Sequence, residues 1–400
     1  MTKRPIIIGI DGGASKVSAH IVEVSEDGKS FTLGKENSVK EYRDYPDFQP
    51  DFKPIDLKIQ LEQIQKNNIV LTTTEIKQSQ SYYNAFKYAI SDLVKSTKTE
   101  KILIGIGMPG VKTNDKRGIA AMANGPRMPY FATEIEQKLL AANIALTTPI
   151  YKLGSDADYC GIGEEYAHNG AFRNIENAYY LGGGTGAADA LKLHEKLISL
   201  DDCKTWIAKT WEMSDENGNS IEMYCSANGI QFIYGNLVGV SQAELKENKI
   251  YLGQILQLAE KDDRIAIATW QTVSRNLANL LFERISTVYS GWQNNFSFIN
   301  PNRDKLSSNH HFKGTLLERI VIGQRLGDII KMKPAQKIIV KPILNHLSQL
   351  IKESKLLDEH AKLHYLKSCK FDNKLIITSQ LREAPALGAG IDAWQSFNNG

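Results

Sequence analysis

Cysteine and long hydrophobic runs are both scarce in this sequence. Only four of its 400 residues are cysteines, and these are Cys160, Cys203, Cys225 and Cys369. No two of them form a CxC or CxxC pair, so we expect neither a structural zinc ion nor a disulfide framework. No apolar stretch approaches the roughly 18 residues that a membrane-spanning helix needs, and we therefore predict no membrane span. A strand-like segment begins at residue 5 without a preceding secretory leader, which favours a cytoplasmic protein.

An excess of charge of one sign is also absent. The 48 Lys and Arg residues nearly balance 45 Asp and Glu residues, which leaves a formal net charge of +3. This charge is too small for a general polyanion binder, so we expect no nucleic-acid partner. Apolar residues make up 42% of the chain, enough to bury real cores, and the length predicts two or three domains.

A glycine-containing hairpin is predicted at the start of the chain. Residues 6–10 predict a strand, Asp11-Gly12-Gly13 follows, and the alternation of apolar and polar residues at 17–21 predicts the returning strand. Such glycines allow a backbone to bend and to present N–H groups to a phosphate. The spacing is that of neither a Walker A loop nor a Rossmann loop. A tight turn with a capping aspartate is the alternative interpretation.

The same pattern returns later in the chain. Residues 177–181 predict a strand, residues 182–186 (GGGTG) a turn, and residues 187–193 a second strand. The hydroxyl of Thr185 would add one more donor to this second turn. Two turns of this kind favour phosphate binding over a purely structural role.

The remaining elements indicate an α/β protein. We predict helices at residues 79–95, 133–142, 157–167 and 264–288, strands at 101–107, 149–153, 319–323 and 374–378, and a last helix starting at 383–385. Residues 34–68 are rich in charged residues and proline, and we predict a partly ordered insertion there.

An acidic pair follows the strand predicted at 149–153, in Ser155-Asp156-Ala157-Asp158. A carboxylate at a strand end can face a cleft, which makes Asp156 a candidate for chemistry. The alternative is a helix N-cap. Asp158 competes for the same role, although inside the first helical turn it would interact mainly with the helix dipole.

Taken together, these segments resemble the ROK sugar kinases, which belong to the actin, Hsp70 and hexokinase superfamily. The matching segments, in order, are residues 11–13, 105–110, 155–158, 163–164, 182–186 and 384–389. The resemblance spans residues 5–395 and implies two actin-like (ribonuclease H-like) α/β domains, with ATP and sugar meeting in a cleft. The expected domains are residues 1–150, with the helix at 383–400 packing back on them, and residues 151–382.

The resemblance also implies site residues. The first phosphate loop would be Asp11, Gly12, Gly13 and Lys16, and the second would be Gly183, Gly184, Thr185 and Gly186. Gly323 and Ala386 would contact the nucleotide. Asp11 would also hold Mg²⁺, through water.

For the acceptor, the resemblance makes Asp156 the catalytic base. Ser155 stands where an asparagine usually binds a sugar hydroxyl, and Asn124 and Glu222 match two further sugar-binding residues. For Glu222, an exposed helix residue is the alternative.

The sequence also departs from the family pattern. The zinc segment CxCGxxGC is absent, so no zinc is expected, and Trp211-Glu212-Met213 is at most a remnant of the GEIGH-like sugar motif. Residues 322–325 (IGQR) stand where the family has a run of glycines beside the adenosine of the nucleotide. No helix-turn-helix precedes the first hairpin.

The function that these features predict is transfer of the γ-phosphate of ATP to a sugar or polyol hydroxyl, as in a glucokinase. Glucose, an N-acetylated hexosamine, another hexose and a cyclitol all remain possible acceptors, and a homodimer is one possible oligomeric state. The alternative is a non-catalytic sensor of sugar or nucleotide with the same fold. A superfamily ATPase with an iron–sulfur cluster is disfavoured, because the cysteines are single and scattered.

Overall fold

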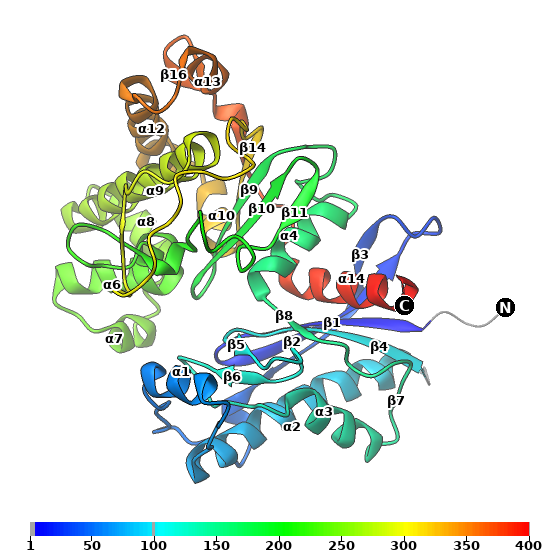
Figure 1. Cartoon of the computed structure of the whole chain (residues 1–400). Helices are drawn as coiled ribbons and strands as arrows, with labels where there is room; N and C mark the ends of the chain where they lie inside the picture. The colour runs from blue at the N-terminus through cyan, green and yellow to red at the C-terminus, as the bar shows by residue number, and fades with distance from the viewer. Residues whose placement is uncertain (1–4, 98–100, 400) are drawn as a thin grey trace. The chain divides into compact units, whose positions relative to one another are not determined.

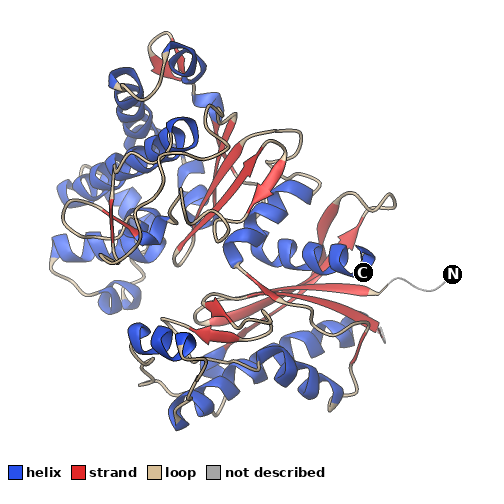
Figure 2. Ribbon diagram, viewed as in Figure 1, coloured by secondary structure: helices blue, strands red, loops and turns tan. Residues whose placement is uncertain are grey.

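The computed structural model describes residues 5–97 and 101–399 (Figures 1 and 2). The chain divides into two units. The first contains the residues up to His168 together with those from Glu383 onward, and the second contains Asn169–Arg382. This division lies later than the expected boundary at residue 150, because the strand and helix that follow this point pack within the first unit.

The first unit contains a mixed sheet. Its strand order is β3 (Phe31–Glu41), β2 (Lys16–Val24), β1 (Ile6–Gly12), β4 (Lys101–Gly107) and β7 (Ala145–Leu146), and β8 (Leu153–Gly154) also pairs with β4. Strands β1, β2 and β3 are antiparallel neighbours, whereas β4 runs parallel to β1 and to β7 and β8. The apolar runs of β1 and β4 are buried, as is usual for central strands with both faces covered.

Helices cover both faces of this sheet (Figure 1). One face carries α2 (Thr73–Thr97) and α3 (Phe131–Leu140), and the other carries α4 (Asp156–Tyr166) and α14 (Ala384–Asn399). Helix α14 lies close to the sheet because Gly9 and Gly105 have no side chain. A Cβ on Gly9 would lie 2.0 Å from the carbonyl oxygen of Ala386, and one on Gly105 would lie 1.8 Å from that of Ala389. The C-terminal helix is therefore part of the first unit.

The segment 34–68 is more regular than the sequence indicated. Its first residues complete β3, and a short 3-10 turn (Tyr42–Asp44) and helix α1 (Leu57–Gln65) follow. The N-cap of α1 is Asp56, whose carboxylate accepts the amide hydrogen of Lys58. A small hairpin of β5 (Val111–Lys112) and β6 (Ile119–Ala121) lies beside α1.

The second unit contains a sheet of related topology. Its order is β11 (Lys196–Ile198), β10 (Ala187–Leu193), β9 (Ala178–Gly183), β14 (Arg319–Gly323) and β17 (Ile376–Thr378). The hairpin β9–β10 is antiparallel, and β14 runs parallel to both β9 and β17. Each sheet thus joins a glycine-ended hairpin to parallel strands. This confirms the actin-like α/β class predicted from the sequence.

The rest of the second unit is mainly helical. Its helices are α5 (Glu222–Cys225), α6 (Ala227–Val238), α7 (Gln242–Glu247), α8 (Leu252–Glu260), α9 (Arg264–Ser290), α10 (Gln324–Lys331), α11 (Lys333–Ala335), a π-helical turn η3 (Gln336–Val340), α12 (Lys341–Glu353) and α13 (Glu359–Tyr365). Short strand pairs are β12 (Met213–Ser214) with β13 (Ser297–Phe298) and β15 (Leu366–Lys367) with β16 (Lys370–Phe371). The central helix α9 buries Trp270, Leu277 and Leu281 in the core. None of the described helices is long and apolar enough to cross a membrane.

Candidate functional site

The first glycine turn begins later than predicted. Asp11 and Gly12 still belong to β1, where they pair with Ser18 and Val17. The amide of Gly13 donates to the carbonyl oxygen of Lys16 at 2.9 Å and closes the turn. The amide of Gly13 is therefore committed to the turn, and the exposed tip of residues 14–16 is what the hairpin presents to solvent.

The two glycines of this turn have different roles. A Cβ on Gly12 would lie 1.9 Å from Sδ of Met108, so Gly12 is needed for core packing. A Cβ on Gly13 would have the carbonyl oxygen of Lys16, at 3.4 Å, as its nearest neighbour. Only Gly13 leaves open backbone surface that another molecule could approach.

Asp11 is electrostatically unusual. Burial, together with the nearby carboxylates of Asp156 and Glu383, raises the pKa of its carboxyl group to about 7 against the opposing charge of Lys16. The structure thus brings Asp11 and Asp156 into one group of carboxylates, as the resemblance implied. Glu383 is a member of this group to which the sequence analysis gave no role; its only sequence signal was its position before the last helix.

Asp156 is the first residue of α4 and not its N-cap. The N-cap is Ser155, whose side chain makes no capping hydrogen bond, while Oδ1 of Asp156 accepts the amide hydrogen of Ala157 at 3.0 Å. Asp158 lies farther along the same first turn. The start of α4 therefore places Ser155 and Asp156 at the carboxyl end of β8, where that strand pairs with β4.

Tyr159 fixes the start of α4 against the sheet. Its ring packs where Gly107 and Gly154 lack side chains, and its hydroxyl donates to Asp392 of α14 at 3.1 Å. Asp392 also pairs with Lys152 at 3.0 Å. Burial raises the pKa of Tyr159 well above its usual value, so its hydroxyl stays neutral and acts as a donor.

The second glycine turn lies at the end of β9. The amide of Gly184 donates to the carbonyl oxygen of Gly186 at 2.9 Å, and Thr185 and Gly186 are exposed. Gly183 is needed for packing, since a Cβ there would lie 2.2 Å from the carbonyl oxygen of Cys225. The accessible part of this turn is therefore Gly184, Thr185 and Gly186.

Glu222 belongs to this second turn. Its Oε1 accepts the amide hydrogen of Ala187 at 2.8 Å, and a Cβ on Gly186 would lie 2.7 Å from the same oxygen. Glu222 is half-buried at the start of α5, so the alternative of an exposed helix residue is wrong. A carboxylate at this position suits a sugar hydroxyl and repels a phosphate.

A buried polar network holds this hairpin on α9. Asp189 of β10 accepts the hydroxyl hydrogen of Tyr179 at 2.6 Å and pairs with Arg284 at 3.1 Å. Arg284 also pairs with Glu283 at 2.9 Å, and the amide of Thr210 donates to Asp189 at 2.8 Å. These groups are buried and bond one another, although Nε of Arg284 is buried without a partner among the described residues, and the network fixes the strand that follows the turn.

Gln324 is a second residue that the sequence analysis did not assign. It follows Gly323 at the end of β14 and has a φ of 55°, in the left-handed region. A Cβ on Gly184 would lie 2.3 Å from its Oε1, so its side chain lies against the second turn. Gly323 itself is buried under Tyr180, since a Cβ there would lie 2.2 Å from the tyrosine hydroxyl.

Two residues that the sequence singled out have partners within the protein. Ala386 is fully buried against Gly9, so the structure gives it a packing role and it offers no surface to a nucleotide. Glu212, in the segment considered a remnant of the sugar motif, accepts the amide hydrogen of Lys209 and pairs with Arg303.

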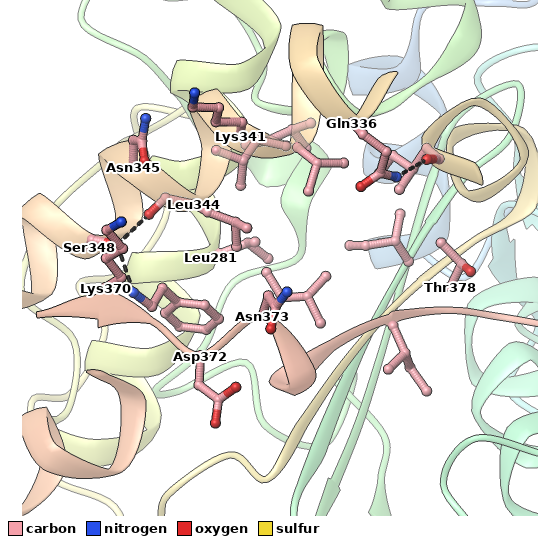
Figure 3. Close-up of a pocket in the computed structure, with 18 of the residues that line it drawn as sticks. Leu281, Gln336, Lys341, Leu344, Asn345, Ser348, Lys370, Asp372, Asn373 and Thr378 are labelled. Carbon is pink, nitrogen blue, oxygen red and sulfur yellow. Dashed lines mark hydrogen bonds between the residues drawn. The ribbon is translucent and has the colours of Figure 1, made fainter. Parts of the chain in front are cut away.

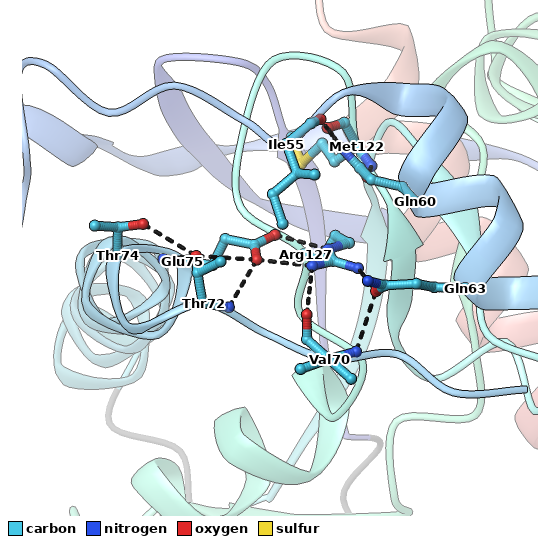
Figure 4. Close-up of polar contacts among 9 residues, drawn as sticks. All are labelled: Ile55, Gln60, Gln63, Val70, Thr72, Thr74, Glu75, Met122 and Arg127. Carbon is cyan, nitrogen blue, oxygen red and sulfur yellow. Dashed lines mark hydrogen bonds and ion pairs between the residues drawn. The ribbon is translucent and has the colours of Figure 1, made fainter.

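Asn124 is exposed on the loop after β6, and its neighbours are held firmly (Figure 4). The side-chain amide of Gln60 bonds both the N–H and the carbonyl oxygen of Met122, at 2.8 and 3.2 Å. The insertion therefore anchors the loop that carries Asn124.

Metal ligands do not cluster in the described residues 5–97 and 101–399. No group of three or more His, Cys, Asp or Glu side chains is arranged there to hold a metal ion. Any Mg²⁺ would therefore need oxygens from a substrate or from water in addition to Asp11.

The chain matches no protein-family model and no curated protein sequence. It does match solved structures over nearly its whole length. A ROK family glucokinase from Streptomyces griseus, in complex with glucose and AMPPNP, has a TM-score of 0.58 at 13% identity, with 98% of this chain and 99% of that chain covered. A ROK hexokinase from Thermus thermophilus has a TM-score of 0.55 at 12% identity, with coverages of 99% and 100%.

A regulator has the same architecture. A ROK family transcriptional regulator, a homologue of the E. coli MLC protein, has a TM-score of 0.53 at 11% identity, with 97% of this chain and 78% of that chain covered. At these identities the likeness concerns the fold, which is that of ROK sugar kinases.

Proposed function

We propose that this protein is a cytoplasmic kinase that transfers the γ-phosphate of ATP to a hydroxyl of a hexose or related polyol. The observation that carries the proposal is the electrostatic interaction of Asp11 in β1 with Asp156 at the start of α4, in a chain with the fold of ROK sugar kinases. Phosphoryl transfer needs a positioned acceptor, charge neutralisation and one base; one carboxylate of the pair can act as the base, and the other can hold a cation that neutralises charge.

In this proposal Asp156 is the general base. It would accept the proton of the acceptor hydroxyl as that oxygen attacks the γ-phosphate. Its Oδ1 already accepts the amide hydrogen of Ala157, which orients the carboxylate. Ser155 and Asn124, both on the first unit, would bind other hydroxyls of the acceptor.

Asp11 is the proposed ligand of Mg²⁺, directly or through water. The residues fit a cation, because Asp11 is a carboxyl group whose ionisation is opposed by burial and by two neighbouring carboxylates, and a divalent cation would offset all three. Magnesium bound with the nucleotide would neutralise charge on its phosphates. Asp11 must be ionised to serve in this way.

Each unit offers one glycine turn as a phosphate contact. Lys16 on the first turn, and Thr185 and Gly186 on the second, would supply the side-chain or backbone donors on exposed surface. The amides of Gly13 and Gly184 are used within the turns, so these glycines would contribute only accessible backbone. Gly12 and Gly183 would contribute by letting the core pack beneath the turns. Glu222 would accept a hydrogen bond from a sugar hydroxyl, and Gln324 would lie beside the nucleotide.

The direct test is release of ADP from Mg·ATP over a panel of glucose, other hexoses, N-acetylated hexosamines and cyclitols. We expect one acceptor to raise ADP release far above the rate with water alone, and Asp156→Asn to abolish the increase. Absence of any acceptor-dependent release, together with absence of nucleotide binding by calorimetry, would exclude a kinase.

A second function, a non-catalytic sensor of sugar or nucleotide, is favoured by one observation. The Glu222 carboxylate accepts the amide hydrogen of Ala187 at the second turn, so this amide is not available as a donor to a phosphate. For a sensor we expect a ligand-induced rise in the melting temperature without ADP release for any acceptor. The same panel, measured by thermal shift and by turnover, separates the two functions.

A further inference from the structure

The second unit contains a cavity of about 1030 Å³ (Figure 3). It is bounded by α9, α10, η3, α12, β17 and the hairpin β15–β16. None of the residues of the glycine turns lines it. It is therefore separate from the proposed phosphate sites.

The floor of the cavity is aliphatic. Leu277 and Leu281 of α9, Leu326 and Ile330 of α10, and Ile343 of α12 line it with side chains that are almost wholly buried. Protein interiors contain few voids much larger than a water molecule, and a volume of roughly 300–1,000 Å³ is typical of sites for small ligands. A hollow of this size is large enough to hold a small ligand.

The lining is also strongly positive. It includes four lysines, Lys331, Lys341, Lys367 and Lys370, and a single carboxylate, Asp372. The resulting formal excess of three positive charges equals the net charge of the entire 400-residue chain. All four lysines are exposed, so their apolar stems can line the cavity. Nζ of Lys331 donates to the carbonyl oxygen of Ser379 at 2.7 Å and lies 4.0 Å from Oδ1 of Asp328, and Nζ of Lys367 donates to the carbonyl oxygen of Leu363 at 3.2 Å.

Two of these lysines face each other across a hairpin. Lys367 and Lys370 are directly opposite in the antiparallel pair β15–β16, an arrangement of like charges that destabilises a hairpin. Ser368 and Cys369 form its two-residue turn, both with positive φ. Ser348 of α12 holds the hairpin over the cavity, because its Oγ accepts the amide hydrogen of Phe371 at 2.8 Å (Figure 3). An anion at this position would relieve the repulsion.

We propose that this cavity is a binding site for an amphipathic anion with an aliphatic chain and a carboxylate head, like a fatty acid. Leucine and isoleucine side chains would contact the chain, and Lys341 and Lys370 would attract the head. The apolar floor disfavours a small hydrophilic anion, and the lysines disfavour a neutral or cationic lipid.

The probes are dodecanoate below its micellar concentration, dodecyltrimethylammonium with the same chain and the opposite charge, and acetate with the head alone. Calorimetry on the full chain should show saturable 1:1 binding of dodecanoate, no detectable binding of acetate, and binding of the cation that is weaker by roughly tenfold or more. Equal binding of cation and anion, or binding of dodecanoate without saturation, would overturn the proposal.

Variants locate the site. Lys341→Glu with Lys370→Glu should weaken dodecanoate binding by roughly tenfold or more, whereas Lys337→Glu with Lys374→Glu, at exposed lysines that do not line the cavity, should change it little. Leu344→Trp, at a half-buried lining residue of α12, should obstruct part of the cavity and weaken binding without loss of fold, as checked by circular dichroism. Wild-type affinity in a folded Leu344→Trp protein would show that dodecanoate binds elsewhere.

Discussion

The Arg127 guanidinium and the Glu75 carboxylate form a two-point ion pair in which both side chains are buried (Figure 4). Nε donates to Oε1 at 2.7 Å and Nη2 donates to Oε2 at 2.8 Å. The remaining donors of Arg127 reach Gln63 and the carbonyl oxygen of Val70. The pair thus fastens α2, the segment after α1, and the loop of Asn124 to one another.

Breaking this pair should be costly. Arg127→Met leaves the Glu75 carboxylate buried without its partner, so we expect a loss of about 3–5 kcal/mol in the free energy of unfolding, measured with urea. Replacing Glu75 by Leu as well should restore part of this loss. The control is Lys40→Met, which removes the half-exposed pair with Asp92 and should cost at most about 1 kcal/mol. A small loss for Arg127→Met would show that the pair contributes little.

Asp11 should make the stability of the ligand-free protein fall as pH rises. Its pKa of about 7 in the folded state lies above the ordinary value of 3.8, so the folded state holds the proton more tightly. The penalty for ionisation is therefore absent below about pH 4 and complete above about pH 7. Asp11→Asn should raise the urea midpoint relative to wild type clearly more at about pH 8 than at about pH 5, whereas the exposed Asp51→Asn should show no such difference.

Replacement of Asp156 by Asn should lower turnover on the true acceptor by roughly 10²–10⁴-fold, because a base is lost, while ATP affinity stays near wild type. The companion variant Asp158→Asn should keep most of the activity. Steady-state kinetics and calorimetry measure the two quantities. If Asp158→Asn alone is inactive, the base is two residues farther along α4; if both variants are active, neither aspartate is the base.

Gly186→Ala should reduce nucleotide affinity, because the added Cβ projects into the accessible part of the second turn. This variant also places its Cβ 2.7 Å from Oε1 of Glu222, so a displaced carboxylate could cause the same loss. Calorimetry with Mg·ATP should therefore compare Gly186→Ala in the wild-type and Glu222→Ala backgrounds. A loss in both backgrounds supports phosphate approach at Gly186, and a loss only in the first assigns the effect to Glu222.

Gly105→Ala should destabilise the first unit by about 1–3 kcal/mol or more, because its Cβ would lie 1.8 Å from the carbonyl oxygen of Ala389 and push α14 from the sheet. Gly253→Ala in α8 is the matched control, since its Cβ meets open space. That change should stabilise the protein by a few tenths to about 1 kcal/mol. Thermal melting of both variants tests the contrast.

The sequence predicted the two hairpins and the parallel strands well, because alternation, buried isoleucine runs and paired glycines are local signals. It was wrong about the strand at 149–153, of which only Leu153 is extended in β8. The amide of Ile150 donates to Glu136 at 2.7 Å and its carbonyl oxygen accepts from Arg117. Side chains from distant segments thus take the backbone bonds that a neighbouring strand would have made.

The candidate site was predicted less completely, because several of its contacts depend on packing between segments far apart in the sequence. Glu222 looked equally suited to an exposed helix, and only the position of α5 beside the second turn brings it to Ala187. Gln324 and Glu383 carry no motif of their own. Ala386 lies in a segment that resembles a family motif. In the structure, its role is in the close packing of α14 on Gly9.

Because α14 packs on β1 and β4, the first unit can be completed only after the end of the chain has been synthesised. The chain leaves the first unit after His168, builds the whole second unit, and returns at Glu383. Until α14 emerges from the ribosome, the backbone surfaces at Gly9 and Gly105 have no cover, and the nascent first unit exposes one apolar face of its sheet. The second unit is contiguous in sequence and can therefore fold first, although the chain begins with the other.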